Sequence, residues 1–248
     1  MPQNDRDNFW GLGDILRGTL KTYQLCKKYN LRFIVDIQLH NLSNYLVYYP
    51  HEYENIIGNN KDNIEFIFGD KLEEHIVTNK NELLYFFTTA QCEDNLDDEA
   101  KNFMKNILTP NCLLAEYIYK KSINIPDNYN ILHYRLGDEE LVRKNSLTDI
   151  HQTYLNHLKN NVEDNDILLS DSRDFKKIAK SVHYKKLIIF DTEPKHIGYE
   201  STESMNDTLF EFFIITKSKK IKTYSRYGWI SGFVFWAHKV YDIPLQTI

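Results

Sequence analysis

The chain of 248 residues is 42% hydrophobic and 26% charged, which is enough apolar content to bury one large core or two small ones. Its formal net charge of -5 gives no basic footprint for nucleic acid. No window reaches the roughly 18 apolar residues that span a bilayer, and the N-terminus lacks the pattern of a signal peptide. We therefore expect a cytoplasmic protein that neither binds nucleic acid nor spans a membrane. One local group of lysines is interpreted as a solvated edge: Lys217, Lys219, Lys220 and Lys222.

The cysteines and histidines show no metal-binding pattern. Cys26, Cys92 and Cys112 are odd in number and lack a CxxC spacing, which argues against a disulfide framework and a zinc site. We interpret them as reduced, structural residues. The nine histidines form no HExxH or similar motif, so no metal site is predicted.

The first half of the chain is expected to begin with a turn and a helix. The glycines of GLGD (11–14) lead into apolar residues at helical spacing over about 14–29, and Asn30 marks the end. Residues 31–37 predict a strand buried on both faces. No boundary is assigned over 38–95, and 97–122 predicts helix with a break at Pro110. A polar connector then places the boundary between lobes at 124/125.

The second half alternates strands with helices. Predicted strands cover 129–134, 166–170, 186–190 and 220–224, and predicted helices cover 148–159, 174–182, 205–218 and 227–240. This alternation predicts an α/β protein with a parallel sheet and helices on both faces.

Ligands of such sheets bind outside the carboxyl ends of the strands. Chemistry-bearing residues gather at four such ends, in GLGD (11–14), HYRLGD (133–138), SDSRD (170–174) and TYSRYGW (223–229). These four stretches are the candidate site.

Arg135 is the most informative candidate. Its guanidinium can hold a diphosphate in two charge-assisted bonds and stabilise the charge of a leaving nucleotide. Gly137 would let the backbone approach the ligand, and Asp138 could hold Arg135 in its rotamer. The alternative is a surface ion pair at a strand end, which contributes little.

The other two strand ends allow two roles each. Asp171 and Ser172 fit either the N-cap of a helix or a reader of guanine, whose N1 and N2 donors a carboxylate can accept. Ser225, Arg226 and Tyr227 precede an apolar helix, whose N-terminus would form an anion pocket. Capping of that helix by Ser225 is the alternative.

In this order the four stretches resemble the fucosyltransferase superfamily of two-lobed inverting glycosyltransferases, which includes the α1,2-, α1,6- and protein O-fucosyltransferases. GLGDILRGTLKTYQLCKKYNLRFIVDI is similar to the family's GLGN helix and following strand, and ILHYRLGDEE to its HxRxGD motif. DILLSDSRDFKKIAK resembles its strand, SDD and helix, and NDTLFEFFIITKSKKIKTYSRYGWISGF its DxxxMSxxxxxIxxxSxFSWW segment. The match covers about 10–37 and 129–236 and leaves 38–128 unmatched.

The resemblance implies a GT-B-like fold of two Rossmann-like lobes, an acceptor-side lobe over 1–124 and a donor-binding lobe over 125–248. It implies transfer of fucose from GDP-fucose to a glycan hydroxyl, with no cofactor and no metal. Arg135 would bind the β-phosphate with support from His133, and Asp171 and Ser172 would lie by the guanine. The remaining implied donor-site residues are Gly11, Gly13, Gly137, Asp138, Asp207, Ser225, Arg226 and Tyr227.

Two departures from the family pattern affect the expected chemistry. Asp14 replaces the Asn of GLGN, and Gly228 replaces the serine of FSWW, which leaves Ser225 as the expected phosphate ligand. An inverting transfer also calls for a general base. Asp14 is the first candidate, followed by Asp36 and Glu139.

The acceptor is expected to be a cytosolic glycan intermediate, as in microbes or viruses that build their own glycans. A tyrosine group in the unmatched region would either stack on sugar rings or pack at a lobe interface: Tyr45, Tyr48, Tyr49 and Tyr53. Two alternative functions stay open, which are the same fold with another nucleotide sugar and a non-catalytic nucleotide- or glycan-binding module.

Overall fold

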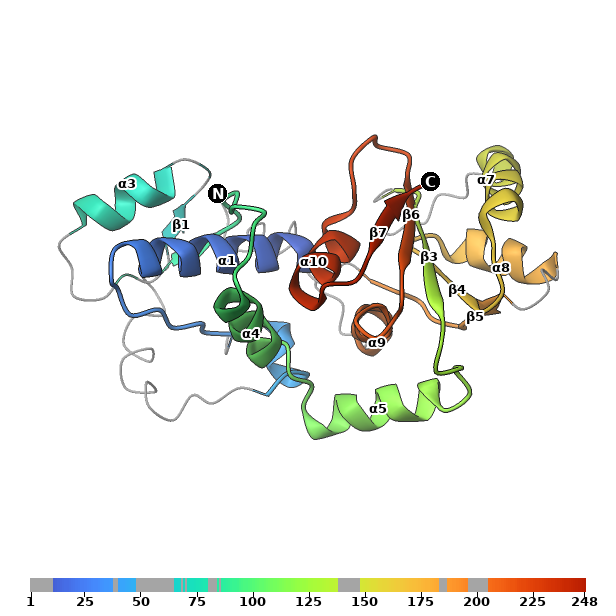
Figure 1. The fold of residues 1–248 in the computed structure, drawn as a ribbon, viewed down its shortest axis with the longest axis horizontal. Helices are drawn as coiled ribbons and strands as arrows, with labels where there is room; N and C mark the ends of the chain where they lie inside the picture. The colour runs from blue at the N-terminus through green and yellow to red at the C-terminus, as the bar shows by residue number, and fades with distance from the viewer. Residues whose placement is uncertain are drawn as a thin grey trace. The chain divides into compact units, whose positions relative to one another are not determined.

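A computed structural model describes residues 11–37, 40–47, 65–67, 69, 71–79, 84, 86–137, 148–182, 187–195 and 205–248 (Figure 1). The chain forms two compact units. The N-terminal unit covers Gly13–Leu113, and the C-terminal unit covers Leu114–Ile248 with Gly11 and Leu12. The acceptor and donor roles of the two predicted lobes stay predictions.

The C-terminal unit is built on a five-stranded parallel sheet in the order β5-β4-β3-β6-β7. Its strands are β3 (Asn130–Arg135), β4 (Asp166–Ser170), β5 (Ile188–Ile189), β6 (Ile221–Ser225) and β7 (Leu245–Thr247). The central β3 and β4 have apolar side chains on both faces, and Ile131, Leu132, Ile167 and Leu168 are fully buried. Such two-sided burial is typical of parallel strands between helices. The predicted α/β class is confirmed.

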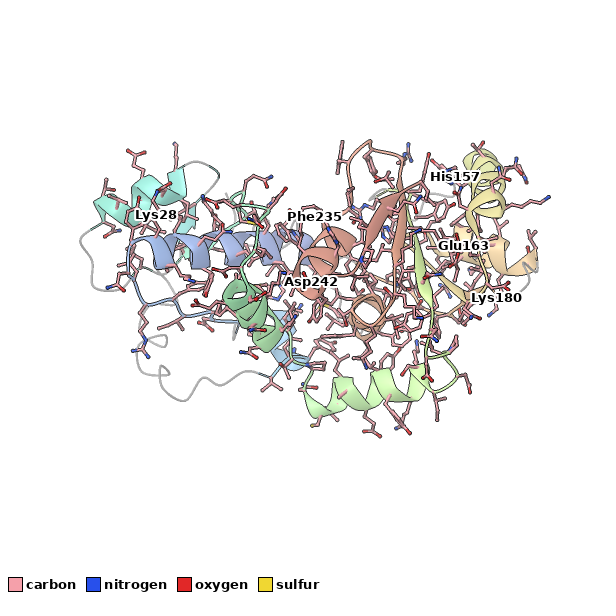
Figure 2. All side chains as sticks on the ribbon, in the orientation of Figure 1. Lys28, His157, Glu163, Lys180, Phe235 and Asp242 are labelled. Atoms are coloured by element: carbon pink, nitrogen blue, oxygen red, sulfur yellow. The ribbon has the colours of Figure 1, made fainter. Side chains whose placement is uncertain are left out.

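Helices cover both faces of this sheet (Figure 1). On one face, α7 (Thr148–Asn161) and α8 (Arg173–Ser181) pack on Leu132 and Tyr134. Figure 2 shows His157 on α7, whose Nδ1 lies 2.8 Å from the Tyr134 hydroxyl. On the other face lie α9 (Asn206–Ile215) and α10 (Gly232–Tyr241), where Phe233 stacks on His133. The alternation along β3 therefore sends its odd and even residues to different helix layers.

The helix α5 (Cys112–Ser122) packs beside α9, with the rings of Tyr117 and Phe210 6.3 Å apart. The predicted helical stretch over 97–122 is confirmed as α4 (Asp98–Ile107) and α5, with Pro110 between them. Asp97 caps α4, because its Oδ1 accepts from the Ala100 N–H at 2.7 Å.

The last predicted helix begins later than expected. The sequence predicted a start at Tyr227, but α10 starts at Gly232. Gly228 lies at φ +74, a backbone conformation that helical residues do not adopt. Because Trp229 and Ile230 are apolar, the hydrophobic pattern continued through this loop and concealed the boundary. The short strand β7 after α10 was not predicted.

The N-terminal unit contains α1 (Leu12–Lys28), the 3₁₀ turn η2 (Asn41–Asn44) and α3 (Lys71–Thr78), followed by α4. Its described strands β1 (Glu65–Ile67) and β2 (Phe86–Thr88) form a two-stranded parallel sheet. The predicted end of α1 is confirmed. Asn30 lies at φ +51, and the Leu31 N–H donates to the Cys26 carbonyl, which is a Schellman motif.

The predicted strand over 31–37 is wrong, because these residues form no sheet ladder. Leu31 is exposed, and the ring of Phe33 packs against Phe103 of α4 at 5.6 Å instead. An apolar run shows that a segment is buried but not which partner buries it.

The interpretation of the lysine group as a solvated edge is wrong for one member. Lys217 and Lys219 are exposed, but Lys222 points from β6 into the unit and is only 2% exposed. Its Nζ lies 2.6 Å from Oδ2 of the fully buried Asp166 and 3.5 Å from Glu163 (labelled in Figure 2). A buried charge requires such a partner.

The three cysteines are free, as expected, but only Cys26 is buried, and Cys112 is exposed. None of the helices in the described part of the chain combines the length and apolar character that crossing a bilayer requires.

Candidate functional site

The candidate residues of three stretches meet at the carboxyl edge of the C-terminal sheet. The register pairs Tyr134 with Ser170 across β3 and β4, and Arg135 with Ser225 across β3 and β6. Because the strands are parallel, the segments that follow them leave the sheet side by side. HYRLGD, SDSRD and TYSRYGW therefore contribute to one surface.

Asp171 organises the end of β3. Its Oδ1 accepts from the Leu136 N–H at 2.7 Å and its Oδ2 from the Gly137 N–H at 3.1 Å. The same Oδ2 lies 3.4 Å from Nε of Arg135. The Asp171 side chain is 7% exposed and that of Arg135 is 23% exposed. Asp171 thus holds the inner edge of the guanidinium and the backbone that follows it, while Arg135 reaches the surface.

His133 lies beneath this edge and is buried. Its Nδ1 is 3.0 Å from Oγ1 of Thr223 on β6, and its ring stacks on Phe233 of α10 at 6.4 Å. Burial, with the nearby charge of Arg135, lowers the pKa of His133 to about 3. The imidazole is therefore neutral at physiological pH. It supports the sheet end below Arg135 and adds no charge.

The segment after β6 is tied to the segment after β3. The Arg226 N–H donates to the Arg135 carbonyl at 3.2 Å, and Nη1 of Arg226 donates to the Leu136 carbonyl at 3.1 Å. Gly137 lies at φ +147, and a Cβ there would be 2.7 Å from the Tyr227 hydroxyl oxygen. The backbone angle favours glycine at this position, and a larger residue would also displace the Tyr227 side chain.

The later start of α10 changes the predicted role of Ser225. The hydroxyl of Ser225 accepts from the Tyr227 N–H at 3.3 Å within the loop, and Ser231 occupies the N-cap position of α10. Ser225 and Arg226 therefore do not stand at a helix N-terminus, and the predicted anion pocket at that helix end is wrong. The loop nevertheless lies at the same edge as Arg135.

Ser172 has the capping role that the sequence left open. Its hydroxyl accepts from the Phe175 N–H at 3.1 Å at the start of α8, and the residue is 1% exposed. A guanine contact by Ser172 stays a prediction.

Asp207 makes its contacts with other parts of the C-terminal unit. Its Oδ1 accepts from the Tyr117 hydroxyl and from Lys121 Nζ of α5, both at 2.5 Å, and its Oδ2 accepts from the Glu193 N–H at 2.9 Å. Burial would raise the pKa of Asp207, but these hydrogen bonds outweigh burial and lower it. Asp207 joins α9 to α5, and its place in the donor site stays a prediction.

Three further predicted residues lie at the start of α1. Gly11 precedes α1, and Gly13 and Asp14 lie in the first turn of that helix. Asp14 Oδ1 accepts from Nη2 of Arg17 at 2.8 Å. Asp138 and Glu139 lie outside the described residues, as do Tyr48, Tyr49 and Tyr53.

A buried charge cluster next to this edge was not predicted from the sequence. Lys176, in the first turn of α8, donates to the Thr192 carbonyl at 2.6 Å and pairs with Glu211 of α9 at 2.9 Å. Glu211 also bonds the Thr192 hydroxyl. The cluster fastens the segment after β5 to two helices. A lysine and a glutamate in otherwise apolar helix faces were the available signal.

Thr223 and Trp229 were also missed as partners of the candidate residues. Thr223 pairs with His133 in the β3–β6 register, which no spacing along one strand reveals. Trp229 stacks on Tyr227 with ring centroids 5.1 Å apart. Within the described residues, no group of three or more histidine, cysteine, aspartate or glutamate side chains is arranged to hold a metal ion.

No protein-family model and no curated protein matches the chain. Among solved structures it is similar to NodZ alpha-1,6-fucosyltransferase co-crystallized with GDP, with a TM-score of 0.55, 13% identity, and coverage of 92% of this chain and 88% of that one. The chain has the fold of a fucosyltransferase. A NodZ structure soaked with GDP-fucose matches with a TM-score of 0.53, 12% identity, and 93% and 89% coverage. NodZ from Bradyrhizobium matches with a TM-score of 0.53, 13% identity, and 92% and 88% coverage.

The resemblance inferred from the four motifs is thereby confirmed at the level of the fold, and with it the GT-B-like α/β class. At 12% to 13% identity the shared property is the fold. The chemistry of this chain has to be argued from its own residues.

Proposed function

We propose that this protein is a metal-independent inverting glycosyltransferase that transfers fucose from GDP-fucose to a glycan hydroxyl. The observation that carries the proposal is Arg135, held by Asp171 at the carboxyl edge of a parallel sheet. The fold match to NodZ, which was crystallized with GDP and soaked with GDP-fucose, supports the choice of donor.

In the proposed complex, Arg135 binds the diphosphate of the donor. Asp171 contacts Arg135 through Nε, and in the proposed complex the guanidinium binds phosphate oxygens through charge-assisted hydrogen bonds. The carboxylate fixes the rotamer of Arg135, so little side-chain entropy is lost when the ligand binds. Asp171 therefore acts as a positioning residue. A lysine could not replace Arg135, because a single ammonium cannot meet both Asp171 and a phosphate in the same planar arrangement.

The reaction breaks the bond between the anomeric carbon and the β-phosphate oxygen while the acceptor oxygen forms a new bond from the opposite face. Negative charge grows on the leaving GDP, and the acceptor hydroxyl loses its proton. Arg135 stabilises that charge, and a preorganised donor of this kind contributes about 3 kcal/mol to the lowering of the barrier. Asp14 is the first candidate to accept the proton, followed by Asp36 and Glu139.

One observation favours a second candidate, the same reaction with a different nucleotide. Both Asp171 oxygens already accept hydrogen bonds from backbone N–H groups. These are the same oxygens that were predicted to accept hydrogen bonds from guanine. Selectivity for the base would then depend on other residues near the end of β4. A donor with another base is the natural alternative to GDP-fucose.

The test is donor turnover by the purified full chain. GDP release from GDP-fucose is measured without acceptor, with glycan acceptors, and with EDTA. We expect slow hydrolysis without acceptor, faster release with a suitable acceptor, and no loss of rate with EDTA. Arg135→Ala should abolish both rates, whereas Lys180→Ala, a charge loss in the last turn of α8 (Figure 2), should change neither. Turnover of UDP-sugars with none of GDP-fucose would replace the donor assignment.

A further inference from the structure

Trp229 is an exposed aromatic side chain in the loop that is hydrogen-bonded to the segment of Arg135, the residue proposed to bind the diphosphate. It lies in the loop between β6 and α10, and 68% of its surface is exposed. One face of its ring stacks on Tyr227, with an interplanar angle of 27°. Among the described residues after the carboxyl ends of the sheet strands, no other large apolar side chain is so exposed.

The support under Trp229 is firmly anchored. The Tyr227 hydroxyl lies against Gly137, and the Arg226 guanidinium lies 5.7 Å from the centre of the Tyr227 ring. Arg226 is bonded through its N–H and its side chain to the carbonyls of Arg135 and Leu136. The two rings are therefore fixed to the segment that carries Arg135. Because the Tyr227 and Trp229 rings are already ordered, binding of a ligand ring against them would cost little conformational entropy.

The strand order indicates which part of a nucleotide sugar Trp229 would meet. β3, with Arg135, lies between β4 and β6, and neighbouring strands are about 4.8 Å apart. A donor with its diphosphate at Arg135 and its base toward the end of β4 points its sugar toward the end of β6. Trp229 follows β6. A pyranose has a face of weakly positive C–H groups, which complements the negative face of an indole.

We propose that Trp229, supported by Tyr227, is a stacking platform for a pyranose ring, that of the donor sugar or of the acceptor. The inference rests on the proposed function, because it places the diphosphate at Arg135. It adds a sugar subsite to the site, with a residue to which no role has been assigned.

The experiment compares Trp229→Ala and Trp229→Phe with Tyr119→Ala, an aromatic truncation on α5 that is matched in exposure at 67%. Calorimetry gives the Kd of GDP and of GDP-fucose for each variant of the 248-residue chain. Saturation-transfer NMR with methyl pyranosides of glucose, galactose and N-acetylglucosamine, with and without GDP, gives the acceptor arm.

If the donor sugar stacks on Trp229, Trp229→Ala weakens GDP-fucose binding about fivefold and leaves the Kd of GDP within twofold. If the acceptor stacks there, Trp229→Ala leaves the Kd values of GDP and GDP-fucose unchanged and abolishes the saturation-transfer signal of the methyl pyranosides. Trp229→Phe should retain most binding in either case, and Tyr119→Ala should behave as the wild type.

Three results would overturn the platform: equal weakening of GDP and GDP-fucose, which indicates base stacking or a structural role; no change in any arm; or a wild-type chain that binds neither GDP-fucose nor a pyranoside. A wild-type chain that binds pyranosides through Trp229 but not GDP would refute the proposed donor and keep the platform. The two proposals can therefore fail separately.

Discussion

The C-terminal unit and the N-terminal unit differ in how their strands are buried. In the C-terminal unit, β3 and β4 lie between two helix layers and have apolar residues on both faces. In the described residues of the N-terminal unit, β1 and β2 are three residues long and form a small separate sheet. The difference shows why candidate ligand residues gather where they do. Long parallel strands bring the segments that follow them to one edge, whereas short strands do not define such an edge.

The same contrast governs how charge is stabilised. In the described residues of the C-terminal unit, Lys176 pairs with Glu211 and Lys222 pairs with Asp166, and all four side chains are buried. The described ion pairs of the N-terminal unit, such as Lys27 with Glu99, are largely exposed. Buried pairs are costly to break, and exposed pairs contribute little.

The largest predicted effect tests this contrast in charge burial. Asp166→Ala removes the acceptor of Asn130 Nδ2, the Glu163 N–H and Lys222 Nζ. The buried Lys222 ammonium then keeps the Asn161 carbonyl at 2.7 Å and the exposed Glu163 carboxylate at 3.5 Å but loses its buried counter-charge. We expect a loss of about 3–5 kcal/mol in the free energy of unfolding, measured by urea denaturation with circular dichroism. Glu99→Ala in the N-terminal unit is the control and should produce a much smaller shift. Equal shifts would contradict the contrast.

Two glycines separate stability from binding. A Cβ on Gly18 of α1 would lie 1.7 Å from the Thr88 carbonyl oxygen, so Gly18→Ala forces the helix away from β2 and should cost about 1–3 kcal/mol. The affinity of Gly18→Ala for GDP should equal that of the wild type.

Gly137→Ala strains a backbone at φ +147 and displaces Tyr227, so it should weaken GDP binding as well as cost about 1–3 kcal/mol. Calorimetry together with urea denaturation measures both quantities, and weakened GDP binding in Gly18→Ala alone would refute this separation.

A pH dependence follows from His133. Its pKa is about 3 in the folded chain and about 6.5 when unfolded. Between these values the unfolded state binds more protons, so stability rises with pH and is lost as pH falls below 6.5. His133 should account for about 2 kcal/mol of the loss between pH 7 and pH 5. In His133→Gln the urea midpoints at these two pH values should lie closer together than in the wild type; an unchanged difference would show that another group titrates.

The smallest predicted effect on stability concerns Asp14, on the N-terminal unit. Its ion pair with Arg17 is partly exposed, so Asp14→Asn should change the free energy of unfolding by less than about 1 kcal/mol and leave the Kd of GDP unchanged. If Asp14 is the general base, the transfer rate falls by about 100-fold. An unchanged transfer rate in Asp14→Asn would exclude Asp14 as the general base and leave Asp36 and Glu139 as candidates.

Much of the C-terminal unit could be predicted from the sequence because its strands are bounded by polar residues and alternate with segments of helical length. Asn130–Arg135 and Asp166–Ser170 were identified almost to the residue, and their ends brought Arg135 and Asp171 forward as candidates. The direction of the Asp171 carboxylate could not be predicted. It depends on the register between β3 and β4, which is a tertiary property.

Other features failed for identifiable reasons. Tyr227, Trp229 and Ile230 extend the apolar pattern of α10 into the loop before it. The glycine at 228, which the structure places at positive φ, was the available signal for the boundary. Lys222 was grouped with surface lysines because they are its neighbours in the sequence. On a strand, however, every second side chain points inward, and Lys222 is one of these. Its partner Asp166 lies 56 residues away in the sequence, and no local pattern connects the two.

We propose that Arg135 binds the diphosphate of a guanine nucleotide without a metal. Calorimetric titration of the full chain with GDP, UDP and ADP, each with and without EDTA, tests it most directly, with Arg135→Ala and Lys180→Ala in parallel. We expect selective GDP binding that EDTA leaves unchanged, that Arg135→Ala abolishes and that Lys180→Ala preserves. Equal binding of all three nucleotides, no binding, or full affinity in Arg135→Ala would contradict it and leave Arg135 as an ion pair at a strand end.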